Sequence, residues 1–270
     1  MKKILCPIDF SDTAQNGIAY AAKLAKASGS TLTLLNIQPS SSPVSAAENE
    51  LLLNAVAERL EELGKEVRSF FKISCDAEIL QSGGLLSDAI AHRGDDYSMI
   101  VMGTHGVENL IEFFRGSNTY NAIRRSKIPV LLVPRDIIYS EIQSIVFAYN
   151  YLGERKLPLK QLQPWIKSLG CELTVLQVNE EAISQDVLDE MKELQFIISE
   201  QWKEADIIIN FDSIRSAEIA PSIHSYIQRN QKDVLALCTT HRNFIQEIFH
   251  KSVIKIISEI ASYPVLVFHE

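Results

Sequence analysis

The chain has 270 residues, of which 46% are hydrophobic, so it can bury one large core or the cores of two ordinary domains. Its formal charge of −8 argues against the clustered basic surface that nucleic acid binding requires. No apolar run approaches the roughly 20 residues of a membrane-spanning helix, and the opening MKKILCPIDFSD reaches a proline and an aspartate too soon for a signal peptide, so we expect a cytoplasmic protein without a membrane partner.

The first half alternates short apolar runs with longer helical patterns. KKILCPI and TLTLLNIQ are predicted strands, and the helix between them begins at Ser11 or Asp12 and ends at Gly29. The pattern of residues 48–72 predicts an amphipathic helix. Five apolar side chains recur at steps of three and four and so share one face: Leu52, Val56, Leu60, Leu63 and Val67. The runs DAEILQSG, LLSDAIAHRGDD, YSMIVMG, GSNTYNAIRRSK and IPVLLVP then complete a strand, helix, strand, helix, strand series.

The same series begins again in the second half, from IQSIVFAYN to YPVLVFH. SMIVMGTHG corresponds to VLALCTTHR, and SKIPVLLVP corresponds to SYPVLVFH, which indicates an internal duplication. We divide the chain into residues 1–137 and 138–270, and we predict two tandem α/β domains, each with a five-stranded parallel sheet and helices on both faces. Because the apolar final strands would leave exposed edges if unpaired, we expect an intramolecular pseudo-dimer, with a homodimer left open.

One glycine-rich loop follows the fourth predicted strand, in the sequence GTHGVENLIEFFRGSN. A ligand in an open parallel sheet usually lies beyond the carboxyl ends of the strands where the strand order reverses. If the first and fourth strands flank that reversal, their ends are PIDF and MGTHG. Gly103, Gly106 and Gly116 would let backbone amides approach a phosphate, and Ser117 begins a helix whose free N–H groups face the anion. Asn118 can cap that helix or contact the ligand.

The spacing of this loop, GxxG followed after nine intervening positions by GS, resembles the nucleotide motif of the universal stress protein family. The opening KKILCPIDFSDTA and the close of the first half are also similar to that family. The resemblance implies a flavodoxin-like fold of the adenine nucleotide alpha hydrolase type, with ATP as the ligand. It implies that Pro7, Asp9 and Ile37 contact adenine and ribose. The ribose and phosphates would be bound by Met102, Gly103, Gly106, Gly116, Ser117 and Asn118.

Several residues have a simpler interpretation. Asp9 could cap its own loop, and His105 is expected to pack in the loop because no partner at a fixed spacing supports catalysis. We expect magnesium to accompany ATP, held mainly by phosphate oxygens and water, because the sequence offers no carboxylate cage. The cysteines form no CxxC motif or Cys/His cluster, so we expect reduced structural thiols: Cys6, Cys75, Cys171 and Cys238.

The second half departs from the motif. Aligning the closing segments sets Gly103 against Thr239, with Arg242 and Ser252 at the positions of the next two glycines, and Asp9 falls near Asn150. We therefore expect one ATP per chain, bound in the first half. The alternative is that Arg242 binds a different anion in the second half.

Three functions compete. The first is an ATP-binding module for stress response or signalling that changes shape or protein partners with the nucleotide. The second is a slow ATP hydrolase, although the sequence has no GK[ST] motif and no clear base to activate water. SGGLLSD resembles the SGGxDS loop of ATP pyrophosphatases but follows the third predicted strand, not the first. The third is a ligand-free scaffold. We predict the first and assign no catalytic residue.

Overall fold

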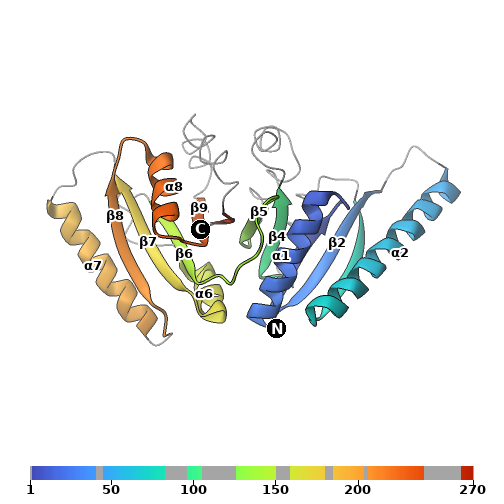
Figure 1. Ribbon diagram of the computed structural model, residues 1–270, viewed down its shortest axis with the longest axis horizontal. Coiled ribbons are helices and arrows are strands. Elements are labelled where there is room, and N and C mark those ends of the chain that lie inside the picture. The colour runs from blue at the N-terminus through green and yellow to red at the C-terminus, as the bar shows by residue number, and fades with distance from the viewer. Residues whose placement is uncertain are drawn as a thin grey trace. The chain divides into compact units, whose positions relative to one another are not determined.

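The computed structural model describes residues 2–40, 45–82, 96–104, 126–149, 159–179, 185–203, 206–239 and 263–269 (Figure 1). The chain divides into two units, Met1–Tyr139 and Ser140–Glu270, called unit 1 and unit 2 below. Three predicted helices, over LLSDAIAHRGDD, GSNTYNAIRRSK and NFIQEIFHKSVIKIISEIAS, fall wholly or almost wholly outside the described residues. Within the described residues, no helix is long and apolar enough to cross a membrane.

Unit 1 contains a parallel sheet with the strand order β3-β2-β1-β4-β5. Its strands are β1 (Lys3–Ile8), β2 (Thr31–Pro39), β3 (Cys75–Ser82), β4 (Met99–Thr104) and β5 (Val130–Pro134). The order reverses between β1 and β4, where Ile4 lies opposite Met99. This confirms the prediction that the first and fourth strands flank the reversal. The inner strands are buried as continuous apolar runs, because helices cover a parallel sheet.

The first helix of unit 1, α1 (Asp12–Ser28), has well-defined ends. The side chain of Ser11 caps its N-terminus by accepting a hydrogen bond from the Ala14 amide at 3.3 Å. Gly29 ends the helix in the left-handed conformation, with φ of 63°. Both predicted ends of the helix are confirmed. Of the two N-cap candidates in the sequence, Ser11 and Asp12, the structure selects Ser11.

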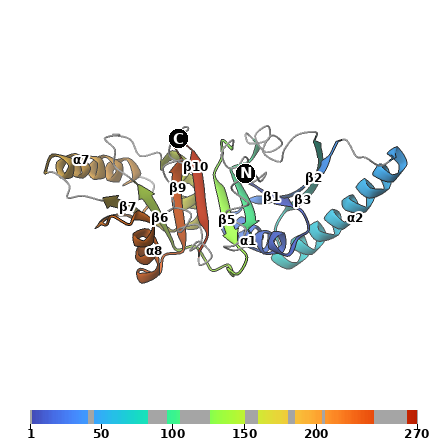
Figure 2. The same ribbon diagram turned by 90° about the horizontal axis from the view of Figure 1, so that it is seen from above.

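The second helix, α2 (Ala46–Phe71), begins with a capping box in which Ser45 and Glu48 bond each other's backbone amides. Leu60 and Val67 are buried as predicted, but Leu52 is 56% exposed. The prediction of one buried face is therefore wrong for the start of the helix. Figures 1 and 2 show that the N-terminal part of α2 extends past the described strands of the sheet.

Unit 2 also contains a parallel sheet, with the strand order β8-β7-β6-β9-β10. When the strands of each unit are counted from its own first strand, this is the same order as in unit 1. The strands are β6 (Ser144–Tyr149), β7 (Glu172–Asn179), β8 (Ile209–Arg215), β9 (Val234–Thr239) and β10 (Val265–His269). Its described helices are the short 3₁₀ turn Leu159–Gln161, α6 (Gln163–Leu169), α7 (Gln185–Trp202) and α8 (Ile219–Arg229). The repeated strand order supports the duplication inferred from the sequence.

The strand registers correct one detail of the alignment between the halves. The closing runs PVLLVP and PVLVFH align on their proline, so Val133 corresponds to Phe268. Gly103 pairs with Val133 in unit 1, and Cys238 pairs with Phe268 in unit 2. Gly103 therefore corresponds to Cys238, and the predicted match to Thr239 is wrong by one residue. The Thr-His pair that both halves contain favoured the incorrect alignment.

Candidate functional site

The structure brings the described members of the predicted site to one edge of the unit 1 sheet. Pro7 lies on β1 and Asp9 follows that strand, while Ile37 lies near the end of β2. Met102 and Gly103 are in the last part of β4. Since β2, β1 and β4 are parallel neighbours, their carboxyl ends meet at this edge. The other predicted contacts lie outside the described residues: Gly106, Gly116, Ser117 and Asn118.

A short loop joins β1 to α1 and carries the predicted carboxylate. Oδ1 of Asp9 accepts hydrogen bonds from the backbone amide of Ser11 at 3.0 Å and from the Ser11 hydroxyl at 2.6 Å. Phe10, between them, has a positive φ of 61°. Asp9 thus has the loop-capping role that the sequence left as an alternative. Its side chain is exposed at the sheet edge, and its role toward a ligand stays a prediction.

A buried amide connects the ends of β1 and β2. Asn36 is 3% exposed, and its Nδ2 donates to the backbone oxygen of Ile8 at 2.8 Å. The amide of Gln38 in turn donates to Oδ1 of Asn36 at 2.6 Å. Sequence reasoning missed Asn36, although a polar residue inside the apolar run TLTLLNIQ was a usable clue. These bonds fix the residue that immediately precedes Asp9.

Close backbone packing positions the end of β4. A Cβ atom added to Gly17 of α1 would lie 2.6 Å from the amide nitrogen of Gly103 and 3.1 Å from its Cα. Only glycine therefore allows α1 to come this close to the strand. One residue earlier, Nδ2 of Asn16 donates to the backbone oxygens of Pro134 at 2.9 Å and Ile137 at 3.1 Å. The first turns of α1 thus support the carboxyl ends of β4 and β5.

The cysteines of unit 1 are poor nucleophiles and poor metal ligands in this environment. Burial raises the pKa of the Cys6 thiol well above its usual range and that of Cys75 to about 11. Both thiols are therefore protonated near neutral pH. Among the residues that the structure describes, no three His, Cys, Asp or Glu side chains gather where they could hold a metal ion. At the described edge the Asp9 carboxylate is exposed, whereas the Asn36 amide is buried and hydrogen-bonded.

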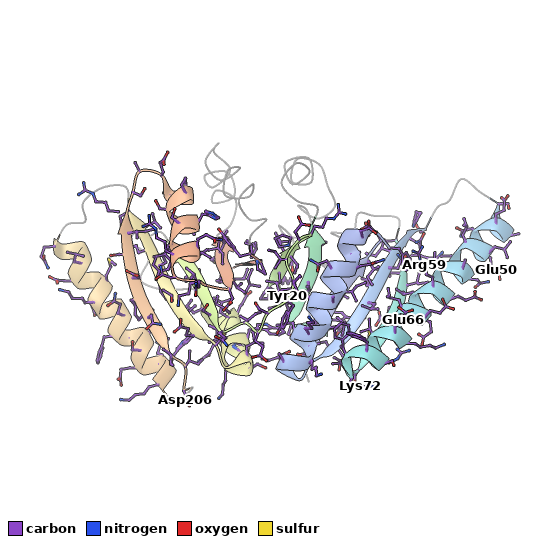
Figure 3. The ribbon with its side chains drawn as sticks, in the orientation of Figure 1. Tyr20, Glu50, Arg59, Glu66, Lys72 and Asp206 are labelled. Atoms are coloured by element: carbon purple, nitrogen blue, oxygen red, sulfur yellow. The ribbon has the colours of Figure 1, made fainter. Side chains whose placement is uncertain are left out.

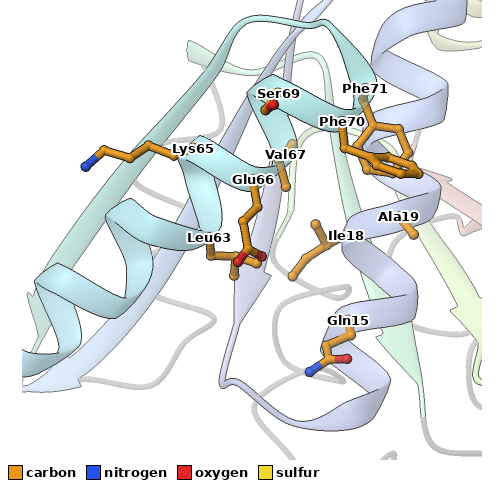
Figure 4. A pocket seen from close by; sticks show the side chains of 10 residues that line it. All are labelled: Gln15, Ile18, Ala19, Leu63, Lys65, Glu66, Val67, Ser69, Phe70 and Phe71. Carbon is orange, nitrogen blue, oxygen red and sulfur yellow. The ribbon is translucent and has the colours of Figure 1, made fainter.

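A separate groove of about 950 Å³ lies between α1 and α2. Figure 4 shows Ile18 of α1 and four apolar side chains of α2 along it, namely Leu63, Val67, Phe70 and Phe71. Of the predicted nucleotide contacts that the structure describes, namely Pro7, Asp9, Ile37, Met102 and Gly103, none lines this groove. It is therefore distinct from the edge described above.

Comparison with known proteins identifies the family. The sequence model of the universal stress protein family matches residues 1–134. A universal stress protein from Methanocaldococcus jannaschii is 32% identical over 158 residues, which cover 50% of this chain and 95% of that protein. The chain belongs to the universal stress protein family. The family match ends at the last residue of β5, so unit 1 carries the recognisable family sequence.

Solved structures show that the universal stress protein fold extends further along the chain. A universal stress protein from Archaeoglobus fulgidus DSM 4304 has a TM-score of 0.77 at 16% identity, and the match covers 99% of this chain and 98% of that one. A structure from Pseudomonas aeruginosa UCBPP-PA14 has a TM-score of 0.57 at 15% identity, covering 100% of this chain and 93% of that one. At these identities the likeness concerns the α/β fold alone.

Proposed function

We propose that this universal stress protein binds ATP in unit 1 and works as a nucleotide-dependent module in stress response or signalling. One observation carries the proposal: the strand order reverses between β1 and β4, and Asp9 and Gly103 lie at the ends of these two strands. Such a reversal is where open parallel sheets bind their ligands. Family membership and the glycine motif support an adenine nucleotide.

Each part of the edge has a distinct role in this proposal. Pro7, Asp9 and Ile37 contact adenine and ribose. Residues at the end of β4 and in the loop after it bind the ribose and phosphates: Met102, Gly103, Gly106, Gly116, Ser117 and Asn118. Magnesium supplies charge neutralisation to the phosphates when bound, and its ligands are phosphate oxygens and water, since the described residues contain no acidic cluster for it.

Unit 2 is proposed to bind no nucleotide. Cys238, whose side chain is buried, occupies the position of Gly103. Gly103 and Cys238 lie equally many residues before the final strands of their units, β5 and β10. At the same offset between the two units, Lys251 corresponds to Gly116. The same register places His241, not Arg242, at the position of Gly106. Arg242 is thus no longer aligned with Gly106, and the alternative that it binds a different anion in the second half stays a prediction.

Calorimetric titration with ATP and Mg²⁺ tests the proposal. We expect one site per chain, which Gly116→Val abolishes because its side chain obstructs the approach of the backbone to the phosphates. Lys251→Val is the matched control at the corresponding position of unit 2, and it should bind like the wild type. Two equivalent sites, or ATP binding by Gly116→Val within a few-fold of the wild type, would overturn the assignment.

Two further measurements address the alternatives. Native mass spectrometry of gently purified protein distinguishes an ATP-binding module, which retains nucleotide, from a ligand-free scaffold. Phosphate release under saturating ATP tests for slow hydrolysis. The division at residues 137 and 138 and the pseudo-dimer remain proposals from the sequence. Separately expressed halves should self-associate or be poorly soluble, and two stable monomers would count against the pairing.

A further inference from the structure

The loop between β1 and α1 is held in an unfavourable backbone conformation. Phe10 has φ of 61°, in the left-handed region that side chains with a Cβ rarely adopt. Such outliers persist only where neighbouring contacts impose them, and they are concentrated at functional sites. Phe10 lies directly between Asp9 and the helix cap Ser11, so its conformation determines where the Asp9 carboxylate points.

Contacts within the loop and from a distant helix act on Phe10 and its neighbours. Within the loop, Asp9 accepts the two hydrogen bonds from Ser11. From outside it, the guanidinium of Arg59 lies over the Phe10 ring, 4.3 Å from the ring centroid. Arg59 projects from the middle of α2, far from Phe10 in the sequence (Figure 3). A guanidinium at this distance is attracted to the ring face by a cation–π interaction.

We infer that Arg59 is a positioning residue for the nucleotide site. Its guanidinium holds the Phe10 ring and thereby keeps the loop in the left-handed conformation that presents Asp9 at the carboxyl edge of the sheet. The role toward nucleotide rests on the function proposed above, whereas the effect on the loop does not. Arg59 would thus link α2, which lies outside the nucleotide motif, to the geometry of the site.

The test uses the full chain, four single variants and the double variant of Phe10→Leu with Arg59→Met. Arg59→Met removes the cation and keeps the length of the side chain, Arg59→Lys retains a cation, and Phe10→Leu removes the ring. Arg68→Met is the control, because Arg68 lies on the same helix but bonds the backbone oxygen of Cys75 and the carboxylate of Glu61. If general loosening of α2 were responsible for an effect, Arg68→Met would show it at least as strongly.

The first measurement is made without nucleotide. The ¹³Cα and ¹³Cβ chemical shifts of Phe10 report its backbone conformation, and we expect them to move in Arg59→Met, to move less in Arg59→Lys, and to stay unchanged in Arg68→Met. The second is the dissociation constant for ATP. Arg59→Met should weaken binding about two- to fivefold, as expected for losing one exposed cation–π contact. In the Phe10→Leu background the same change should have no further effect.

The outcomes separate the two proposals. Unchanged Phe10 shifts in Arg59→Met would overturn the inference about the loop, whatever the nucleotide does. Changed shifts with an unaltered ATP affinity would overturn the positioning role. If the wild type binds no ATP while Arg59→Met still changes the Phe10 shifts, the proposed function fails and the control of the loop by Arg59 stands.

Discussion

Replacing Gly17 by alanine tests the close approach that positions the end of β4. Alanine is a better helix former, so the substitution alone would stabilise an exposed helix by about 0.8–1.0 kcal/mol. Here, however, the new Cβ would lie 2.6 Å from the backbone nitrogen of Gly103. Backbone cannot rotate away as a side chain can, so α1 or β4 must move.

The expected net effect is a loss of stability. Adding a methyl group to a packed contact costs about 1–3 kcal/mol, and the upper half of that range applies because the obstructing atoms are backbone. Subtracting the gain in helix propensity leaves a loss of about 1–2 kcal/mol in the free energy of unfolding. With a urea m-value of about 1–3 kcal/mol/M, the unfolding midpoint should fall by roughly 0.3–2 M.

Gly64→Ala is the matched control in the other helix of the same unit. Its Cβ would lie 3.3 Å from Nη1 of Arg68 and 3.6 Å from the Ala77 methyl, so the end of the Arg68 side chain, which also donates to the Cys75 backbone oxygen, must shift only slightly. This glycine is therefore replaceable, and we expect a free energy of unfolding equal to the wild type or higher by up to about 1 kcal/mol. Urea titration of both variants decides the matter. A Gly17→Ala variant as stable as Gly64→Ala would refute the close packing of α1 on β4.

Three other changes have defined outcomes. Asn36→Leu should lower the free energy of unfolding by about 1–3 kcal/mol in urea titration, because the Ile8 carbonyl loses a buried donor. Burial raises the pKa of the Cys75 thiol to about 11, above its unfolded value of about 8.5. Between these two values only the unfolded chain loses the proton, so the free energy of unfolding falls as the pH rises from about 8.5 toward 11. The stability difference between pH 8 and pH 10 should shrink in Cys75→Ala, and an unchanged difference would contradict the assignment. Lys232→Met should cost about 1–2 kcal/mol by urea titration, because Lys232 pairs with Glu172 while only 14% exposed, and adding Glu172→Gln should recover part of the loss.

The sequence sufficed for features that depend on local chemistry or on chain order. The ends of α1 follow from a side-chain cap at Ser11 and a left-handed glycine at Gly29, and neither needs a distant partner. The alternation of strands and helices predicted a parallel sheet, and the structure meets the condition that β1 and β4 flank the reversal of strand order. The candidate edge could therefore be located from the sequence, because parallel strands bring their carboxyl ends together.

Features that depend on contacts between distant segments could not be predicted. Gly17 looks like an unfavourable residue inside a helix until Gly103 is seen beside it. Leu52 fits the apolar spacing of α2, but spacing does not reveal where the underlying sheet ends. Likewise, Arg59 reads as an ordinary surface residue of an acidic helix, and only the folded chain places it on Phe10.

The close contact of Gly17 in α1 with Gly103 in β4 gives a second reason to expect that unit 2 binds no nucleotide. Gly29 and Gly170 end the first helices of the two units in the same left-handed conformation, and each precedes the second strand. Counting back equally from both glycines places Pro158 at the position of Gly17. Proline lacks the amide of a helix interior and disrupts the preceding turn, and α6 has 7 residues where α1 has 17.

A glycine loop alone should therefore not create a second site. We predict that the triple variant Cys238→Gly, His241→Gly and Lys251→Gly, which restores all three glycines at the corresponding positions of unit 2, still binds one ATP per chain. The reason is that in unit 1 the first helix contacts the strand end through Gly17, whereas in unit 2 a proline stands at the corresponding sequence position and α6 begins only at Gln163. Calorimetric stoichiometry is the measurement, with Gly116→Val added to silence unit 1. A second site in the triple variant, or ATP binding that persists after Gly116→Val, would show that the loop is sufficient and that the supporting helix is not required.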